Sequence, residues 1–154
     1  MVLAFAGPAL SQTQLGSDID GEAAGDFSGN SVSLSSDGKR VAIGAPGNDS
    51  NGTDSGHVRV YDYSGNAWTQ VGGDSDGEAA NDLSGISVSL SSDGTRVAIG
   101  ASENGSNGNN AGHVRVYRFA SASSAATPVP TLPLFGLGIL VSLLGFFGLR
   151  KLRQ

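Results

Sequence analysis

The sequence contains no cysteine and only two histidines among its 154 residues. The lack of cysteine excludes a disulfide scaffold, a thiolate zinc site and a cysteine nucleophile. Two histidines are too few for a poly-histidine metal centre. Glycine, by contrast, is abundant, with 24 residues. Because each glycine inside a helix costs about 1 kcal/mol relative to alanine, this content excludes a long coiled coil.

Charge is distributed unevenly along the chain. All 14 acidic residues lie between Asp18 and Glu103, and six of the nine basic residues lie before residue 129. An acidic surface of this kind repels phosphate backbones, so we expect no nucleic-acid partner. The other three basic residues lie in the last five positions: Arg150, Lys151 and Arg153.

A long uncharged run precedes these last bases. Residues 134–149 read LFGLGILVSLLGFFGL, with no charge and one serine. Extended to 132–149, the run comes within the roughly 17–25 residues that a membrane-spanning helix needs. We therefore predict a transmembrane helix, with residues 150–154 as its basic cytoplasmic end and membrane stop. A buried core helix is the alternative.

Residues 120–131 form a Ser/Ala/Pro-rich linker that leads into a short proline-containing motif made of Val129, Pro130, Thr131, Leu132 and Pro133. Together with the predicted apolar helix and the basic end, this motif resembles the bacterial C-terminal sorting tails of the PEP-CTERM type. That resemblance implies processing by an exosortase-type membrane enzyme. An ordinary single-span anchor is the alternative.

The N-terminal residues 1–11 carry an apolar stretch and a small-x-small sequence, which is typical of a signal-peptide cleavage site. We interpret them as the remnant of a signal peptide; a frayed chain end is the alternative. Both ends of the sequence thus predict a cell-envelope location. The chain would be a single-pass membrane or cell-surface protein with residues 12–119 outside the cytoplasm.

The central residues contain a duplication. Residues 15–61 align without gaps onto 71–117 at an offset of 56, and 34 of the 47 positions are identical. This predicts two repeats, at about 15–70 and 71–119.

Each repeat contains short alternating runs of apolar and small polar residues, which is typical of strands. We expect strands at 31–34, 40–45, 57–63 and 68–71, their counterparts in the second repeat, and a strand at 12–15 equivalent to 68–71. Asp37-Gly38 predicts a tight type I′ hairpin. The expected fold is all-β, with two four-stranded antiparallel propeller-type blades.

Phe27-Ser28-Gly29 and Ile43-Gly44-Ala45-Pro46 resemble the FG-GAP repeat, the blade of the integrin α-type β-propeller and a frequent unit of bacterial surface proteins. The resemblance implies an incomplete β-propeller, since closed propellers have typically four to eight blades. Three interpretations remain open. Several chains assemble into one ring as a homo-oligomer, the chain forms an open stack of two blades, or the sequence is a fragment of a longer propeller protein.

An acidic pattern recurs in both repeats around an Asp-Gly turn. Alternating carboxylates of this kind are typical ligands of a calcium-binding loop, and calcium is the one cofactor that we predict. The alternative is a solvated turn between blades. The candidate ligands are Asp18, Asp20, Glu22 and Asp26 in the first repeat, and Asp74, Asp76, Glu78 and Asp82 in the second.

These features predict an exported, surface-anchored module for adhesion or scaffolding, with a protein or polysaccharide ligand and no catalytic activity. His57 and His113 occupy one repeat position beside Arg59 and Arg115. We interpret them as structural polar residues, with the arginines paired to nearby acids. The alternative is an enzyme with an axial site in missing blades, which would require one blade to break the repeat pattern.

Overall fold

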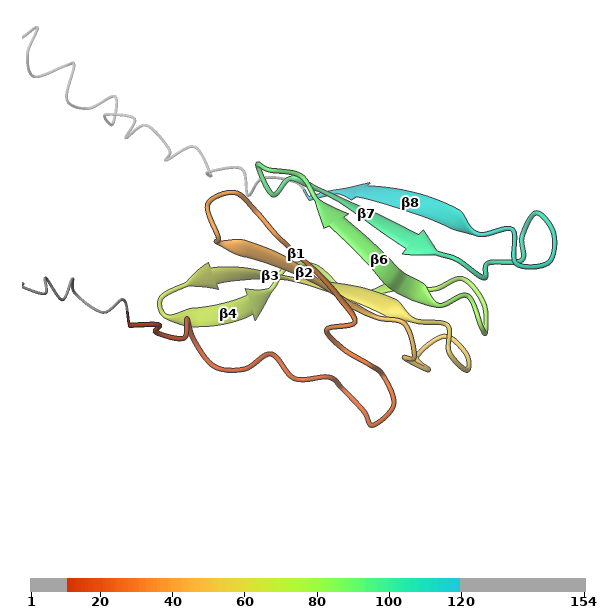
Figure 1. Ribbon diagram of the computed structural model, residues 1–154, viewed down its shortest axis with the longest axis horizontal. Helices are drawn as coiled ribbons and strands as arrows, with labels where there is room; N and C mark the ends of the chain where they lie inside the picture. Colours follow the sequence, from red (N-terminus) through yellow and green to blue (C-terminus); the bar gives the residue numbers. More distant parts are fainter. Residues whose placement is uncertain (1–10, 120–154) are drawn as a thin grey trace, which may run out of the picture. The chain divides into compact units, whose positions relative to one another are not determined.

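The computed structural model describes residues 11–119, which form two antiparallel β-sheets and no helix (Figure 1). The all-β prediction is therefore confirmed for this part of the chain. The first sheet has the order β1-β2-β3-β4, with β5 also paired to β3, and the second has the order β6-β7-β8. The strands are β1 (Ser31–Leu34), β2 (Arg40–Ala45), β3 (His57–Ser64), β4 (Ala67–Gln70), β5 (Ser75–Asp76), β6 (Ser84–Leu90), β7 (Arg96–Ala101) and β8 (His113–Arg118).

The main hydrophobic core lies between the two sheets. Side chains alternate across a strand, so one set of positions in each sheet points toward the other sheet. Burying each of these aliphatic side chains stabilises the fold by about 1.5–3 kcal/mol relative to exposure. The buried set comprises Ala42, Val58 and Val60 from the first sheet and Leu90, Val97 and Ile99 from the second.

A smaller core covers the opposite face of the first sheet. It consists of Val41, Ile43 and Tyr61, with Ile19 and Trp68 packed against them. The segment that precedes β1 therefore supplies part of the cover for this face.

The two sheets approach each other closely at a pair of glycines. A Cβ atom on Gly44 would lie 2.1 Å from the Gly85 carbonyl oxygen, so no larger residue fits there without a backbone shift. Hydrogen bonds reinforce the contact. The Ser31 hydroxyl donates to the Gly85 carbonyl at 2.7 Å, and the Leu90 N–H donates to Ser33 Oγ at 2.8 Å. The sheets thus form one packed unit rather than two separate hairpins.

The expected strand at 12–15 is wrong, because these residues form no strand. Leu15 is the only apolar side chain among them and is 53% exposed, so burial does not favour a pleated conformation. The segment instead lies beside β4, where the Trp68 indole N–H donates to the Leu15 carbonyl at 2.8 Å. Within residues 11–119, the first sheet has five strands, the expected four and β5, and the second sheet has three.

The predicted type I′ turn is also wrong. Gly38 has φ 70°, but Asp37 is not among the residues with positive φ, which both central residues of that turn require. The Asp37 carboxylate accepts hydrogen bonds from the Ser35 hydroxyl and the Lys39 N–H, and these bonds hold a wider turn.

Residues 1–10, the linker and sorting motif at 120–131, the predicted transmembrane helix at 132–149 and the basic end at 150–154 lie outside the described residues. Between residues 11 and 119, no helix of sufficient length and apolar character to cross a membrane occurs.

Candidate functional site

A buried histidine marks the strongest candidate site. His57 is the first residue of β3, where it pairs with Ala45 on one side and with Asp76 on the other. This central position leaves its side chain only 1% exposed. A polar ring in such a place needs partners, because burial without them carries a free-energy cost.

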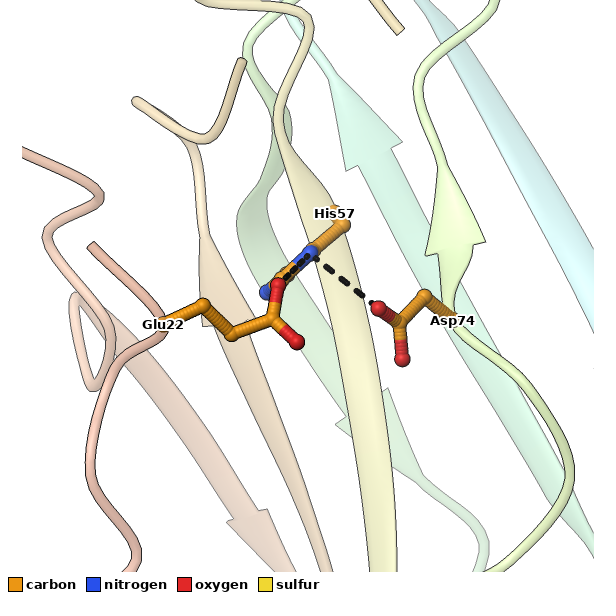
Figure 2. A group of neighbouring side chains, drawn as sticks. All are labelled: Glu22, His57 and Asp74. Atoms are coloured by element: carbon orange, nitrogen blue, oxygen red, sulfur yellow. Dashed lines mark ion pairs between the residues drawn. The ribbon is translucent and has the colours of Figure 1, made fainter. Parts of the chain in front are cut away.

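Two carboxylates flank the ring (Figure 2). The His57 Nδ1 atom lies 3.8 Å from Glu22 Oε2 and 3.7 Å from Asp74 Oδ2. Glu22 comes from the segment before β1, and Asp74 from the connection between β4 and β5. Both repeats therefore contribute to one cluster.

The imidazole nitrogens have no hydrogen-bond partner among the described residues, and both are buried. The two carboxylates lie too far from Nδ1 for a direct hydrogen bond, yet close enough to share a small cation with it. Glu22, His57 and Asp74 each offer one ligand atom, and these atoms lie within 4.8 Å of one another. The cluster can thus hold a metal ion.

The donor set suits a transition metal better than calcium. One imidazole nitrogen and two carboxylate oxygens are ordinary ligands of Zn²⁺, which binds them at about 2.0–2.2 Å. Two such ligands can be no further apart than about 4.2 Å, and the two Nδ1–oxygen distances meet this limit. Calcium instead takes six to eight oxygen ligands.

Arg59 connects the acidic segment to β3. Its Nη2 donates a hydrogen bond to the Asp20 carbonyl at 2.7 Å, and its Nη1 lies 3.6 Å from Glu22 Oε1. The expected pairing of this arginine with a nearby acid is confirmed. Because the guanidinium is buried, the pair fixes Glu22 on the side of the sheet that carries His57.

The second repeat holds the same arrangement in an incomplete form. His113 Nδ1 lies 3.6 Å from Glu78 Oε2, and Arg115 donates to the Asp76 carbonyl. The position equivalent to Asp74 is Pro130, so the chain offers no third carboxylate at that repeat position. His113 is correspondingly more exposed, at 23% of its side chain.

Two of the predicted calcium ligands have structural roles in their own loops. Asp26 accepts hydrogen bonds from the Ala23 N–H and the Asn48 side chain, and Asp82 does so from the Ala79 N–H and the Asn104 side chain. Both aspartates are buried. They close the acidic loops onto the β2–β3 and β7–β8 connections.

The remaining candidates are spread more widely. Asp18 accepts a hydrogen bond from Gln14, while Asp20 and Asp76 offer their carbonyl oxygens to the arginines. Within residues 11–119, Glu22 and Asp74 are the only two candidates that join a group of three or more potential metal ligands. Calcium binding by these loops stays a prediction.

His57 is not among the metal ligands predicted from the sequence. One feature of the sequence could have indicated it. The glutamate and the histidine have the same separation along the chain in both repeats, as Glu22/His57 and as Glu78/His113. The contribution of Asp74 could not be read from that separation, because it depends on how the second repeat follows the first.

Comparison with known families supports the repeat assignment. Residues 18–61 match the model of the FG-GAP repeat family. The matched range begins at the acidic segment and ends in β3, and thus includes Glu22, His57 and Arg59. No curated protein and no solved structure matches the chain. The FG-GAP match and the stacked antiparallel sheets support a β-propeller-like repeat module.

Proposed function

We propose that this chain is an exported, surface-anchored binding module, non-catalytic, that serves adhesion or scaffolding. The predicted tail at 132–149 would hold it in the cell envelope, after or without processing at residues 129–133. Residues 11–119 would face outward and contact a protein or polysaccharide.

The observation that carries this proposal is an acidic edge. Four loops meet at one end of the two sheets: residues 20–30, 46–56, 77–83 and 102–112 (Figure 1). The Asn81 N–H donates to the Thr53 carbonyl and the Leu83 N–H to the Asp54 carbonyl, so loops of both repeats form one surface. We call these four loops the loop edge.

The loop edge contains eight acidic residues, of which all but the buried Asp26 and Asp82 lie at the surface, and no lysine or arginine. Such a surface is complementary to a basic protein, and its many Asn, Ser and Asp side chains offer hydrogen bonds to sugar hydroxyls. The eight acids are Asp20, Glu22, Asp26, Asp49, Asp54, Glu78, Asp82 and Glu103.

The non-catalytic assignment rests on the equivalence of the repeats. A catalytic centre needs a set of groups placed together for one reaction. His57 and His113 each have an equivalent glutamate and arginine neighbour, which supports a structural role, and Asp74 is the one neighbour that His57 has in addition.

An adhesion assay with cells displaying the full chain tests the proposal. Beads coated with poly-L-lysine represent a basic protein, and beads coated with dextran represent a neutral polysaccharide. We expect the double variant Asp54→Asn/Glu103→Gln to lower binding of one bead type severalfold. Asp54→Asn is compatible with the fold, because Asn110 holds the same position and a φ of 51° in the second repeat.

Asp93→Asn is the matched control, since it removes one negative charge from the β6–β7 turn, away from the loop edge. It should leave bead binding unchanged. Equal binding by all variants, or no binding of either bead type, would contradict the role of the loop edge.

A further inference from the structure

The two repeats each have two different faces, and one pair of faces is already joined inside the chain. We define the front face by Ala42, Val58 and Val60 of the first repeat and by Ala98, Val114 and Val116 of the second. The back face is defined by Val32, Leu34, Val41 and Ile43 of the first repeat and by Val88, Leu90, Val97 and Ile99 of the second. The front face of the first repeat packs against the back face of the second.

The outer front face repeats the buried one with identical residues. Val58 and Val60 are 1% and 3% exposed, whereas Val114 and Val116, at the same repeat positions, are 68% and 65% exposed. Exposing these two apolar side chains to water is unfavourable in free energy. They belong to a face whose equivalent in the first repeat is buried.

The outer back face shows the same relation. Leu90 is buried at 8% exposure and Val88 packs beside it, whereas Val32 and Leu34 are 59% and 55% exposed. Val41 and Ile43, the other two residues of this face, are already covered by Ile19 and Trp68. The open parts of the two outer faces are therefore Val32 and Leu34 on the back and Val114 and Val116 on the front, the counterparts of residues that meet between the sheets.

The polar contacts of that interface can be formed a second time. Ser31 and Ser33 bind Gly85 and Leu90 across the sheets, and their equivalents Ser87 and Ser89 retain the same hydroxyls. The equivalents of Gly85 and Leu90 are Gly29 and Leu34, which are also unchanged in residue type. One contact would be lost, because Asn30, which donates to the Ile86 carbonyl, is replaced by Ile86 at the equivalent position.

The pairing between β5 and β3 could also form a second time, between two copies of the chain. β5 pairs Ser75 with Val58 and Asp76 with His57. Their equivalents are Ile19 and Asp20 on one side, and Val114 and His113 on the other. Arg59 holds the Asp20 carbonyl as Arg115 holds that of Asp76, so the 19–20 segment is already in the corresponding place.

The cluster at His113 lacks a second carboxylate, and Asp18 of another copy is in the repeat position to supply it. Asp74 completes the cluster at His57, and its equivalent in the first repeat is Asp18. Asp18 is exposed, and its only side-chain hydrogen bond in residues 11–119 comes from Gln14, which also lies on the surface.

From these correspondences we propose that a second copy of this chain docks head-to-tail, placing its outer back face on the outer front face of the first copy and its Asp18 beside Glu78 and His113. Every copy then contributes one carboxylate to its neighbour's cluster. Such a heterologous contact generates a ring if the rotation closes. Since propellers have typically four to eight blades, a closed ring would hold about two to four copies.

The test measures the mass of the full chain in a mild non-ionic detergent by light scattering. Wild-type chains should associate. Val116→Arg blocks only the front face and Leu34→Glu only the back face, and both residues are exposed, so each variant should fold and remain a single chain. Ser64→Arg adds the same charge as Val116→Arg at the exposed end of β3, outside both faces, and should associate like the wild type.

Mixing the two blocked variants provides the decisive result. Val116→Arg retains an intact back face and Leu34→Glu an intact front face, so the mixture should form a 1:1 pair that cannot grow further. A single-chain wild type, association of either blocked variant alone, or a mixture that stays monomeric would each overturn the proposal. Association through the tail alone is detected as well, because it would leave both variants associated.

Cysteine cross-linking tests the shared cluster itself, and the absence of native cysteine leaves no competing thiol. Under oxidation, Asp18→Cys/His113→Cys should give disulfide-linked multimers, and each single variant should remain one chain. Asp18→Cys/Ser64→Cys is the control and should also remain one chain. If the first double variant stays a single chain, or if the control cross-links equally, the assigned register is wrong.

Discussion

The least satisfied polar group in residues 11–119 is also the one with the most informative surroundings. His57 is buried with both ring nitrogens unpartnered, while two carboxylates lie just beyond hydrogen-bond distance of Nδ1. The sequence indicated the histidine, the arginine and the acids, because all of them recur at an offset of 56. It could not indicate their meeting point, since Asp74 reaches His57 only after the chain has passed through β4.

Zinc should therefore stabilise the full chain. At a free zinc concentration 100-fold above its dissociation constant, we expect a gain of about 2.7 kcal/mol in the free energy of unfolding, seen as a higher melting temperature. In the Leu34→Glu background, where copies cannot stack and the His113 cluster keeps two ligands, His57→Gln should abolish this gain and His113→Gln should retain it. An unchanged wild-type melting temperature would show that the cluster holds no zinc. A calcium titration of the same samples tests the acidic loops.

The aspartate in the β6–β7 turn, Asp93, makes the stability of the fold depend on pH. Hydrogen bonds from the Ser91 hydroxyl, then from the Thr95 N–H and hydroxyl, lower the pKa of Asp93 from 3.8 to about 2. A lowered folded-state pKa means that the stabilisation is present above the unfolded value and is lost as the pH falls toward 2. The melting temperature of Asp93→Asn should thus lie below that of the wild type at pH 6 and approach it near pH 2. A constant difference from pH 6 to 2 would contradict this.

At the scale of strands, alternation was sufficient to predict most of the structure. The strands at Ser31–Leu34 and Arg40–Ala45 have the predicted bounds, because their apolar and small residues alternate. Their burial differs: residues 41–45 are buried on both faces, whereas Val32 and Leu34 are exposed. The strand Ser75–Asp76 had no such signal. It exists only because β3 of the preceding repeat offers a free edge, which is a tertiary cause. The turn at Asp37 differed because its side chain bonds locally.

The close approach of the two sheets gives a matched pair of glycine variants. Gly44→Ala places a Cβ against the Gly85 backbone carbonyl, whereas Gly100→Ala meets mainly the Ser87 hydroxyl, which can rotate away. In the Leu34→Glu background, where copies cannot stack, we expect Gly44→Ala to cost about 2 kcal/mol or more in unfolding free energy, and Gly100→Ala clearly less. Denaturant unfolding measures both values. Equal losses would contradict the packing of β2 against the start of β6.

At the scale of the whole molecule, the period of 56 residues explains both the internal stacking and the outer faces. A repeat that buries its two faces against neighbours leaves one face of each kind open in a pair of repeats. The loop edge is a consequence of the same stacking, because it brings the loops of both repeats to one end. The sequence predicted two stacked repeats from their identity, whereas the alignment of their loops required the structure.

The central claim is that this module is displayed outside the cell, with its loop edge free to bind and its basic end inside. Labelling intact cells with a membrane-impermeant maleimide tests it most directly, because the native chain has no cysteine. Thr53→Cys, in an exposed part of the loop edge, should be labelled on intact cells, and Gln154→Cys only after permeabilisation, provided that the tail is retained. If Thr53→Cys is labelled only after permeabilisation, or if Gln154→Cys is labelled on intact cells, the proposed topology is contradicted.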